Sequence, residues 1–276
     1  MKTRRKNSLA LVMSAFMLMS CGGQQQPGKS EPVVIPDAFT INENLDEEFE
    51  IHTQRQLDYL SYDGEFRTID PNLYPNGSAH ISDPVGVNLS WSYDDEEKTV
   101  TGYTVTYGQN EDLSDGYDVD VTNVTNAAVT LKNVYLGTNY FQIKAKFDDG
   151  SDELSNVRTF TVKDTGPRNL EIDGLTNCRD IGGLETVDGL RIKQGKLFRT
   201  SGNKYDMETA KLSNAGRKEM LEHLGFKTEI NLSNDSAYNV LLEGTTVRDF
   251  FMDYASGTVA SQSHFTRNTE AVKKVF

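Results

Sequence analysis

Reactive side chains gather in two short segments in the second half of the chain. Residues 177–183 read NCRDIGG, and residues 196–202 read KLFRTSG. The first segment places Cys178, Arg179 and Asp180 in direct succession, which offers a nucleophile, a fork of N–H donors and an acid. A guanidinium fork matches phosphate oxygens well. These residue types can serve nucleophilic and acid–base chemistry.

The two segments resemble the opening of the bacterial tyrosine/serine protein phosphatase family. In that family Asn-x-Arg-Asp-(Leu/Ile)-Gly-Gly leads into a (Leu)-(Phe/Tyr)-Arg-Ser-like segment. The resemblance implies a set of residues that bind phosphate or shape the site: Arg179, Asp180, Gly182, Gly183 and Arg199. The two glycines permit positive φ or close backbone approach. The resemblance implies that residues 177–183 form a strand and turn that shape the wall beside the catalytic loop, and direct substrate contact is the alternative.

A third segment, residues 226–233 (FKTEINLS), resembles the family's (Ile)-Lys-Thr-x-Ile-Asp-Leu-Arg strand. Asn231 stands in place of the acid and Ser233 in place of the arginine. Asp253 lies where the family's mobile acid loop is expected, which makes it a candidate general acid, with an ordinary surface aspartate as the alternative. The resemblance therefore extends over three segments in order.

The family's nucleophile belongs to a later His-Cys-x-x-Gly-x-(Asp)-Arg-Thr-Gly loop, where a thiolate at a helix N-terminus forms a cysteinyl phosphate. No Cys-x5-Arg occurs in the 276 residues, which end at Phe276 without such a loop. Cys178 occupies the variable position of its motif, so we interpret it as a small buried thiol. We expect no catalytic nucleophile in this chain and no phosphatase activity from it as given.

Residues 1–20 have the pattern of a secretion signal. Cations precede an apolar stretch at 9–19 that is too short to span a bilayer as a helix. The stretch leads to Leu-Met-Ser-Cys at residues 18–21, which resembles a bacterial lipobox. We therefore predict a lipid anchor at Cys21 in the bacterial cell envelope, on the inner or outer membrane, and a polar tether over 21–43. An ordinary signal peptide with an incidental Cys21 is the alternative.

The charge of the chain limits its partners. The net charge is −13, and because residues 1–20 carry four cations and no acids, the remainder carries −17. This argues against nucleic acid and against an anionic lipid surface as general partners, so we expect membrane contact through the lipid anchor only. The four histidines, His52, His80, His223 and His264, lack metal-ligand spacing, and we expect neither a metal nor a cofactor.

Residues 83–163 alternate apolar and polar positions in several short strands, which predicts a β-sandwich. Trp91 and the segment LGTNY at 136–140 resemble the core tryptophan and the tyrosine corner of a fibronectin type III module, which implies that the Tyr140 ring lies inside. A generic immunoglobulin-like sandwich is the alternative. The preceding segment, 44–82, is expected to be a helix near 44–61 and an irregular connector. A protein partner of the sandwich is not specified.

Residues 164–276 change to an α/β pattern. Short strands are expected at 170–172 and 190–192 and before Arg199, then a helix from Ser213 to Glu222 that stops at Gly225. Strands at 226–232 and 247–254 and the start of a helix at 268–276 follow. A partial sheet leaves open strand edges, so we expect 164–276 to fold poorly alone and 83–163 to fold independently.

The predicted fold class is therefore multidomain, with an all-β fibronectin type III-like sandwich followed by an incomplete α/β phosphatase domain. The resemblance implies an exported lipoprotein of the protein-tyrosine phosphatase type. If a full-length form exists, its substrate is a phosphorylated protein or a small phosphomonoester. The alternative is a non-enzymatic, envelope-anchored binding module with a degenerate phosphatase remnant.

Overall fold

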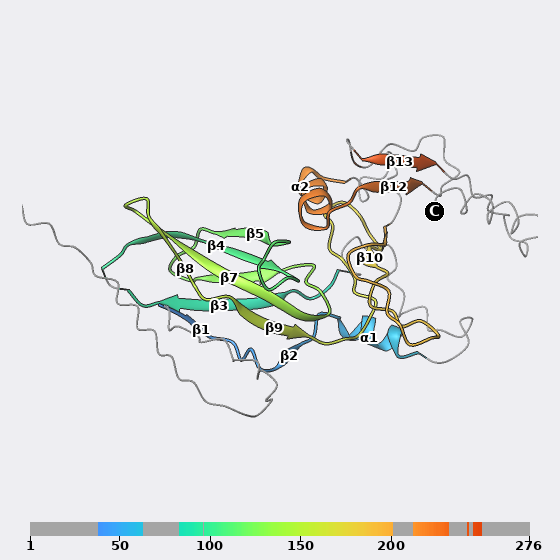
Figure 1. Cartoon of the computed structure of the whole chain (residues 1–276), viewed down its shortest axis with the longest axis horizontal. Coiled ribbons are helices and arrows are strands. Elements are labelled where there is room, and N and C mark those ends of the chain that lie inside the picture. Colours follow the sequence, from blue (N-terminus) through green and yellow to red (C-terminus); the bar gives the residue numbers. More distant parts are fainter. Residues whose placement is uncertain are drawn as a thin grey trace, which may run out of the picture. The chain divides into compact units, whose positions relative to one another are not determined.

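The computed structural model describes residues 38–62, 83–95, 97–200, 212–231, 242 and 245–249. All of them belong to one compact unit, Pro36–Phe276. This part of the chain is rich in β-strands and has few helices (Figure 1). No helix in it is long and apolar enough to cross a membrane.

The larger sheet has six strands in the order β2-β9-β7-β4-β5, with β8 paired to β7. Its strands are β2 (Glu48–Phe49), β4 (Val100–Gly108), β5 (Tyr117–Val121), β7 (Gly137–Phe147), β8 (Asp152–Leu154) and β9 (Arg158–Val162). Strand β7 is antiparallel to β4, β8 and β9, whereas β2 and β9 are parallel. The long central strands β4 and β7 therefore form the middle of this sheet.

A second sheet has three antiparallel strands in the order β1-β3-β6. These are β1 (Phe39–Ile41), β3 (Val87–Tyr93) and β6 (Ala128–Leu131). Side chains from both sheets enter one hydrophobic cluster. Along β3, Val87, Leu89 and Trp91 are buried while Asn88 is exposed, which confirms the alternation expected from the sequence. The Trp91 ring packs edge-on against Tyr103 with centroids 5.2 Å apart.

The segment before β3 differs from the expected helix over 44–61. Helix α1 spans only Gln54–Leu60 and begins with a capping box between Thr53 and Gln56. Upstream of it, the chain contributes strands β1 and β2 to the two sheets. The apolar spacing of Leu45 and Phe49 reflects packing against the shared core rather than a helix face.

The sequence predicted that the Tyr140 ring lies inside at this corner, and this prediction is wrong. Tyr140 is only partly buried, and the position that points inward at the start of β7 is Asn139, which is fully buried. The Asn139 amide donates to the carbonyls of Tyr135 and Gly137, and its Oδ1 accepts the Tyr135 N–H at 2.9 Å. Since side chains alternate along a strand, Asn139 inside requires Tyr140 outside. An asparagine amide thus closes this corner.

The remaining elements follow the cis Gly166–Pro167 peptide. They are β10 (Arg179–Asp180), β11 (Phe198–Arg199), α2 (Asn214–Lys218), a π-helical turn (Glu219–His223), β12 (Thr228–Asn231) and β13 (Thr246–Asp249). The helix expected from Ser213 forms, because the Ser213 hydroxyl accepts the Gly216 N–H at 3.0 Å, and Gly225 follows its end with φ +66°. Strands β12 and β13 are parallel.

Two strands expected in this region do not form. Leu170 and Ile172 are buried in a second small core, but they lie in irregular backbone rather than in a strand. Residues 190–192 take part in only one isolated antiparallel β-bridge, between Glu185 and Arg191, within a short hairpin. Their apolar side chains are exposed, so the run of Leu190 and Ile192 does not mark a buried strand.

This second region, which begins after Pro167, is held to the β6–β7 connection by hydrogen bonds and to strand β5 by an aromatic contact. The Asn133 amide bonds both backbone groups of Glu171, at 2.9 and 2.8 Å, and the Gln194 amide bonds both backbone groups of Leu136, at 2.9 and 3.1 Å. The His223 ring stacks on Tyr117 with centroids 4.3 Å apart. The second region is thus joined to the strands by specific hydrogen bonds as well as by packing.

The buried Trp91 gives a first prediction. Trp91→Ala should lower the free energy of unfolding by about 3–5 kcal/mol, because it removes a large buried ring and leaves a cavity. Leu154→Ala is the matched control: Leu154 is 51% exposed, and its truncation should cost less than about 0.5 kcal/mol. Urea unfolding followed by far-ultraviolet circular dichroism measures both, since the variant lacks the only tryptophan. Equal midpoints for the two variants would contradict the burial of Trp91.

A second prediction concerns alkaline pH. Burial, together with a 2.9 Å hydrogen bond to Glu153, raises the pKa of Tyr93 from 10.0 to about 12. The folded state therefore holds the phenol proton more tightly, and this contribution to stability is present below pH 10 and lost as pH rises through 12. Tyr93→Phe should lose less stability than the wild type between those two values. Urea midpoints of both proteins across this range test it, and parallel curves would refute the contribution.

Candidate functional site

The segment from Asn177 to Arg199 is folded around one buried carboxylate. Asp180 is fully buried, and its Oδ2 accepts bonds from Arg168 Nε at 3.2 Å and Arg168 Nη2 at 3.0 Å. The same oxygen accepts the Gly195 N–H at 2.7 Å, and Oδ1 accepts the Gly182 N–H at 2.8 Å. Four donors therefore fix the Asp180 carboxylate, which leaves it poorly suited to act as a mobile acid.

The partner of this carboxylate, Arg168, is also fully buried. Its Nη1 donates to the carbonyl oxygens of Asn133 and Val134, the latter at 2.9 Å, and its guanidinium lies 4.1 Å from the centre of the Tyr135 ring. A buried charge is tolerated when it is paired and fully hydrogen-bonded. Arg168 is not predicted as a site residue from the sequence, because it ends the segment DTGPR at 164–168, whose composition is that of a linker.

The two glycines after Asp180 allow the hairpin to close. A Cβ on Gly182 would lie 2.3 Å from the Gln194 Cα, and Gly183 has φ +86°, which disfavours any other residue. The Gly183 N–H donates to the Ile192 carbonyl at 2.8 Å. These glycines bring residues 181–184 against residues 192–197.

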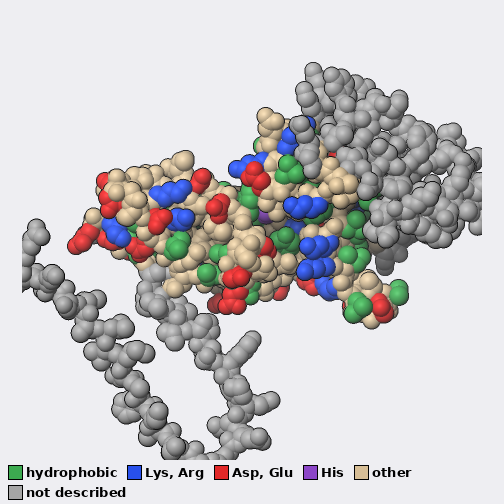
Figure 2. Space-filling model, turned by 45° about the horizontal axis from the view of Figure 1, so that its top comes forward, with side chains coloured by type: hydrophobic (Ala, Val, Ile, Leu, Met, Phe, Trp, Pro, Cys, Tyr) green, Lys and Arg blue, Asp and Glu red, His purple; other side chains and the backbone are tan. Residues whose placement is uncertain are grey.

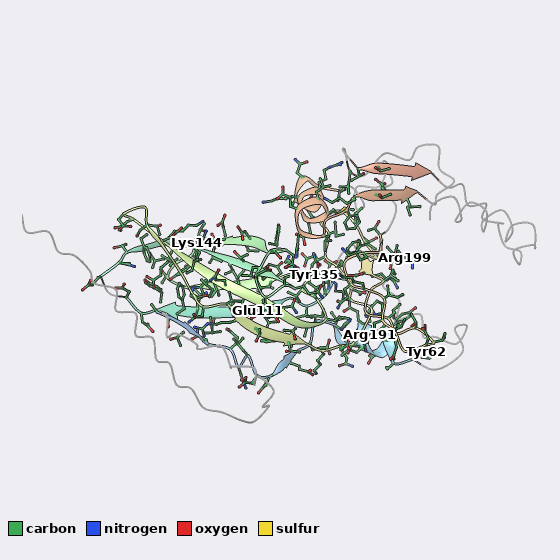
Figure 3. The ribbon with its side chains drawn as sticks, in the orientation of Figure 1. Tyr62, Glu111, Tyr135, Lys144, Arg191 and Arg199 are labelled. Carbon is green, nitrogen blue, oxygen red and sulfur yellow. The ribbon has the colours of Figure 1, made fainter. Side chains whose placement is uncertain are left out.

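Two arginines face each other on this framework. Strands β10 and β11 are antiparallel, and Arg179 is the direct cross-strand partner of Arg199. Arg179 is half-buried and donates to the Asn177 side chain. Arg199, labelled in Figure 3, is exposed. Burial lowers the pKa of Arg179, and the positive charge of Arg199 lowers it further. Like charges directly opposite each other destabilise a strand pair, so an anion bound between them would relieve the repulsion.

Further cations lie on the same segment. Arg191, Lys193 and Lys196 are exposed, and Lys and Arg side chains gather on the face shown in Figure 2. Arg191 pairs with Asp164 at 2.6 Å, with both side chains about half-exposed. Phe198, beside Arg199, stacks on Phe226 with centroids 4.5 Å apart, which anchors β11 to the second core. The site is thus a cationic surface on an otherwise acidic chain.

The other candidate residues fall into two groups. Cys178 is 2% exposed, as expected for a small interior thiol, and its Sγ lies 3.4 Å from the Thr176 carbonyl oxygen. Cys21 and Asp253 lie outside the described residues, as does the helix expected at 268–276. No group of histidine, cysteine, aspartate and glutamate side chains suited to a metal ion occurs among the described residues.

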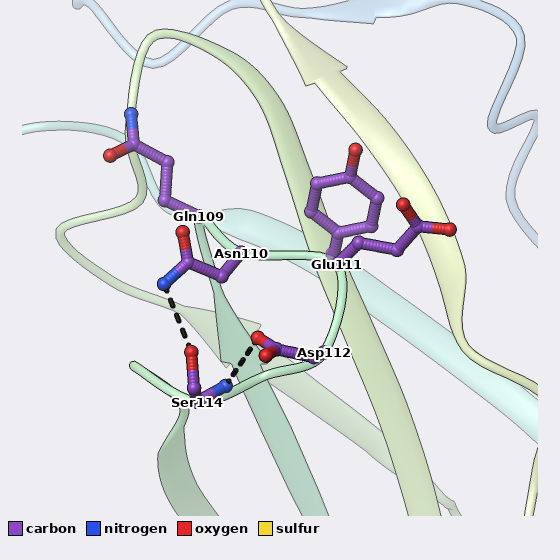
Figure 4. Close-up of a pocket in the computed structure, with 6 residues that line it drawn as sticks. Gln109, Asn110, Glu111, Asp112 and Ser114 are labelled. Carbon is purple, nitrogen blue, oxygen red and sulfur yellow. Dashed lines mark hydrogen bonds between the residues drawn. The ribbon is translucent and has the colours of Figure 1, made fainter.

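A separate hollow of about 540 Å³ lies at the end of β4, outside the motif segments (Figure 4). Its lining contains acids, amides, a hydroxyl and a phenol but no cation: Gln109, Asn110, Glu111, Asp112, Ser114 and Tyr140. Hydrogen bonds within the lining, such as Asn110 Nδ2 to Ser114 Oγ at 3.1 Å, hold the loop. Two carboxylates and no cation make it unsuited to phosphate.

Part of the chain matches a known protein family. Residues 170–273 match the tyrosine phosphatase family. This match includes the Arg179–Arg199 pair and supports a phosphatase-like function for the region. No curated protein matches the chain.

One solved structure with similarity is the twitchin kinase region from C. elegans (Fn31-NL-kin-CRD-Ig26). The identity is 18%, the TM-score is 0.23, and the match covers 40% of this chain and 18% of that chain. The chain therefore spans less than a fifth of that structure's length, and a similarity at this score supports no conclusion about fold or function.

The buried pair gives a third prediction. Asp180→Asn should lower the free energy of unfolding by about 3–5 kcal/mol, because it leaves the Arg168 charge buried without a counter-charge. Asp164→Asn breaks the half-exposed pair with Arg191 instead and should cost less than about 1 kcal/mol. Chemical denaturation of both variants measures the two losses in the free energy of unfolding. Equal losses would show that the Arg168–Asp180 pair is not the constraint described above.

Proposed function

We propose that this chain is an envelope lipoprotein whose second region binds phosphomonoesters through Arg179 and Arg199. The observation that carries the proposal is the direct pairing of these two arginines within residues 170–273, the part that matches the tyrosine phosphatase family. Two guanidinium groups suit a phosphate dianion, because each contributes a charge and a planar fork of donors. The substrate class is therefore a phosphorylated protein or a small phosphomonoester.

The reaction proposed for a form with the complete catalytic machinery is hydrolysis through a cysteinyl phosphate. A thiolate attacks phosphorus, the ester P–O bond breaks, and an acid protonates the departing oxygen. Water then attacks the phosphocysteine, which releases phosphate and restores the thiolate. Neither cysteine of this chain is followed by an arginine six positions later, so these 276 residues supply recognition but not the nucleophile.

Cys178 is a poor substitute for that nucleophile. The residue is 2% exposed, and its thiol donates to the Thr176 carbonyl oxygen at 3.4 Å. A thiolate nucleophile needs N–H donors or cations at the sulfur. The charge of Arg179, the next residue, acts on Cys178, but the Arg179 guanidinium donates its hydrogen bond to Asn177. Cys178 therefore belongs to the small core of this region.

The remaining parts of the proposal rest on the sequence. We assign the strands of residues 83–163 to a fibronectin type III-like module, supported by the two sheets around one core and by the buried Trp91. We assign Cys21 to a lipid anchor in the bacterial cell envelope, supported by the signal-like pattern of residues 1–20. The module would then lie between the anchor and the phosphate-binding region.

A second candidate function is a non-enzymatic binding module with a degenerate phosphatase remnant. It is favoured by Asn231 and Ser233, which replace the acid and the arginine that the resemblance requires. In this case the strands would contact a partner and the second region would serve as a packing element. The two candidates differ in whether the Arg179–Arg199 pair binds an anion at all.

Phosphate binding is the deciding measurement. Residues 22–276 should bind O-phosphotyrosine, and Arg199→Gln should weaken this binding by about tenfold or more through loss of a charge-assisted contact. Lys146→Gln is the control, because Lys146 is an exposed cation that pairs with Asp120 on the strands. Titration calorimetry of the three proteins gives the affinities. Equal affinity in all three would favour the non-enzymatic alternative.

The same protein should not hydrolyse p-nitrophenyl phosphate, since it lacks the nucleophile. Cys178→Ser serves as the check on this statement. Turnover by residues 22–276 that disappears in Cys178→Ser would overturn the role given to Cys178 and restore it as the nucleophile. Binding without turnover supports the recognition role.

A further inference from the structure

The hairpin that follows the glycine pair carries an unusual apolar tip. Its arms are joined by hydrogen bonds from Gly183 N–H to the Ile192 carbonyl and from Thr186 N–H to the Leu190 carbonyl, and Gly189 closes the turn with φ +78°. Val187 is exposed to 110% and Leu190 to 65%. The Val187 and Leu190 side chains take no part in the protein's own core. They mark a contact surface.

Cations lie directly behind this tip. Lys193 and Lys196 are exposed, and neither has a carboxylate partner among the residues that the structure describes. Figure 2 shows Lys and Arg side chains gathered on the same face as exposed apolar side chains. Leu197, between these cations and β11, is 45% exposed. Apolar and cationic groups thus alternate over one short segment.

We propose that residues 183–197 dock onto an anionic lipid surface. An interfacial segment buries its apolar side chains about 5–10 Å deep, at the boundary between headgroups and acyl chains. Lys193 is three positions after Leu190, a distance of about 10 Å in extended chain. Insertion of Val187 and Leu190 therefore places Lys193 at the level of the lipid phosphates. The spacing fits one occupant, a membrane with negatively charged headgroups.

The net charge of −13 does not exclude this contact. At physiological ionic strength the Debye length is about 8 Å, so acids more than two such lengths from the membrane contribute little. The acids that matter are those at the hairpin: Glu185 and Asp188, both exposed, and Asp164, which pairs with Arg191 and leaves Lys193 and Lys196 as the cations available to the lipid. Thr186 donates to Asp188, which lowers the pKa of that carboxyl and keeps it charged. Asp188 therefore opposes the docking, which gives the proposal a sharp test.

A lipid surface fits better than a protein partner for reasons of shape. The apolar side chains project from a narrow turn instead of lining a groove or forming a flat face. A protein would have to supply a matching cavity, whereas a lipid interface accepts a projecting tip without one. If the chain is anchored at Cys21, a second contact of this kind would also fix the orientation of the phosphate-binding region.

Vesicle sedimentation tests the proposal with residues 22–276, which include the whole compact unit from Pro36 and lack an acyl chain. The protein should bind phosphatidylcholine vesicles that contain about one-third phosphatidylglycerol, bind pure phosphatidylcholine weakly, and lose affinity as salt rises. Lys193→Gln with Lys196→Gln should weaken binding about 30-fold. Val187→Ser with Leu190→Ser should weaken it at least about tenfold.

Asp188→Asn should bind the anionic vesicles up to about fivefold more tightly, since it removes a repelled charge next to the tip. Leu154→Ser and Lys146→Gln, changed at exposed positions on the strands, should bind as the wild type does. The proposal is overturned if the wild type fails to sediment with anionic vesicles, or if the hairpin variants and the strand variants behave alike. Loss of phosphotyrosine binding in Arg199→Gln is a separate readout, so this proposal and the phosphate site can fail independently.

Discussion

The pairing of Arg168 with Asp180 is the constraint on which the second region depends. Arg168 holds two carbonyl oxygens at 133 and 134, and Asp180 holds the N–H groups of Gly182 and Gly195. One buried pair thus connects the strand-rich part to both sides of the hairpin. Compared with an apolar replacement, such a pair adds little stability, but it specifies one geometry because every donor and acceptor must be satisfied.

This constraint separates the roles of two neighbouring residues in one motif. The Asp180 side chain points inward, and all of its hydrogen bonds hold the fold. Side chains alternate along a strand, so the Arg179 side chain, one position earlier on β10, points to the opposite face, where Arg199 is its cross-strand neighbour. The buried Arg168–Asp180 pair therefore determines the position of the Arg179–Arg199 pair. Recognition of an anion needs this kind of support, because two mutually repelling guanidinium groups would otherwise separate.

The sequence predicted those features that depend on local periodicity. Alternation along β3 placed Trp91 in the core, and Ser213 and Gly225 marked the helix ends correctly. It failed where tertiary contacts override a local pattern: Leu45 and Phe49, at helical spacing, lie in a turn and in strand β2, and Asn139 takes the inward position assigned to Tyr140. The burial of Arg168 could not be predicted from its local sequence, since its partners lie 12 to 35 positions away. The arginine pair was foreseen only as two separate motif residues, not as cross-strand neighbours.

The burial of Cys178 has a practical consequence. A cysteine residue that is 2% exposed reacts with a thiol reagent only when the chain opens around it. Its alkylation rate therefore reports the opening equilibrium of the second core directly, without an added label. In a compartment that promotes oxidation, the same shielding keeps two copies of the chain from becoming cross-linked through this residue.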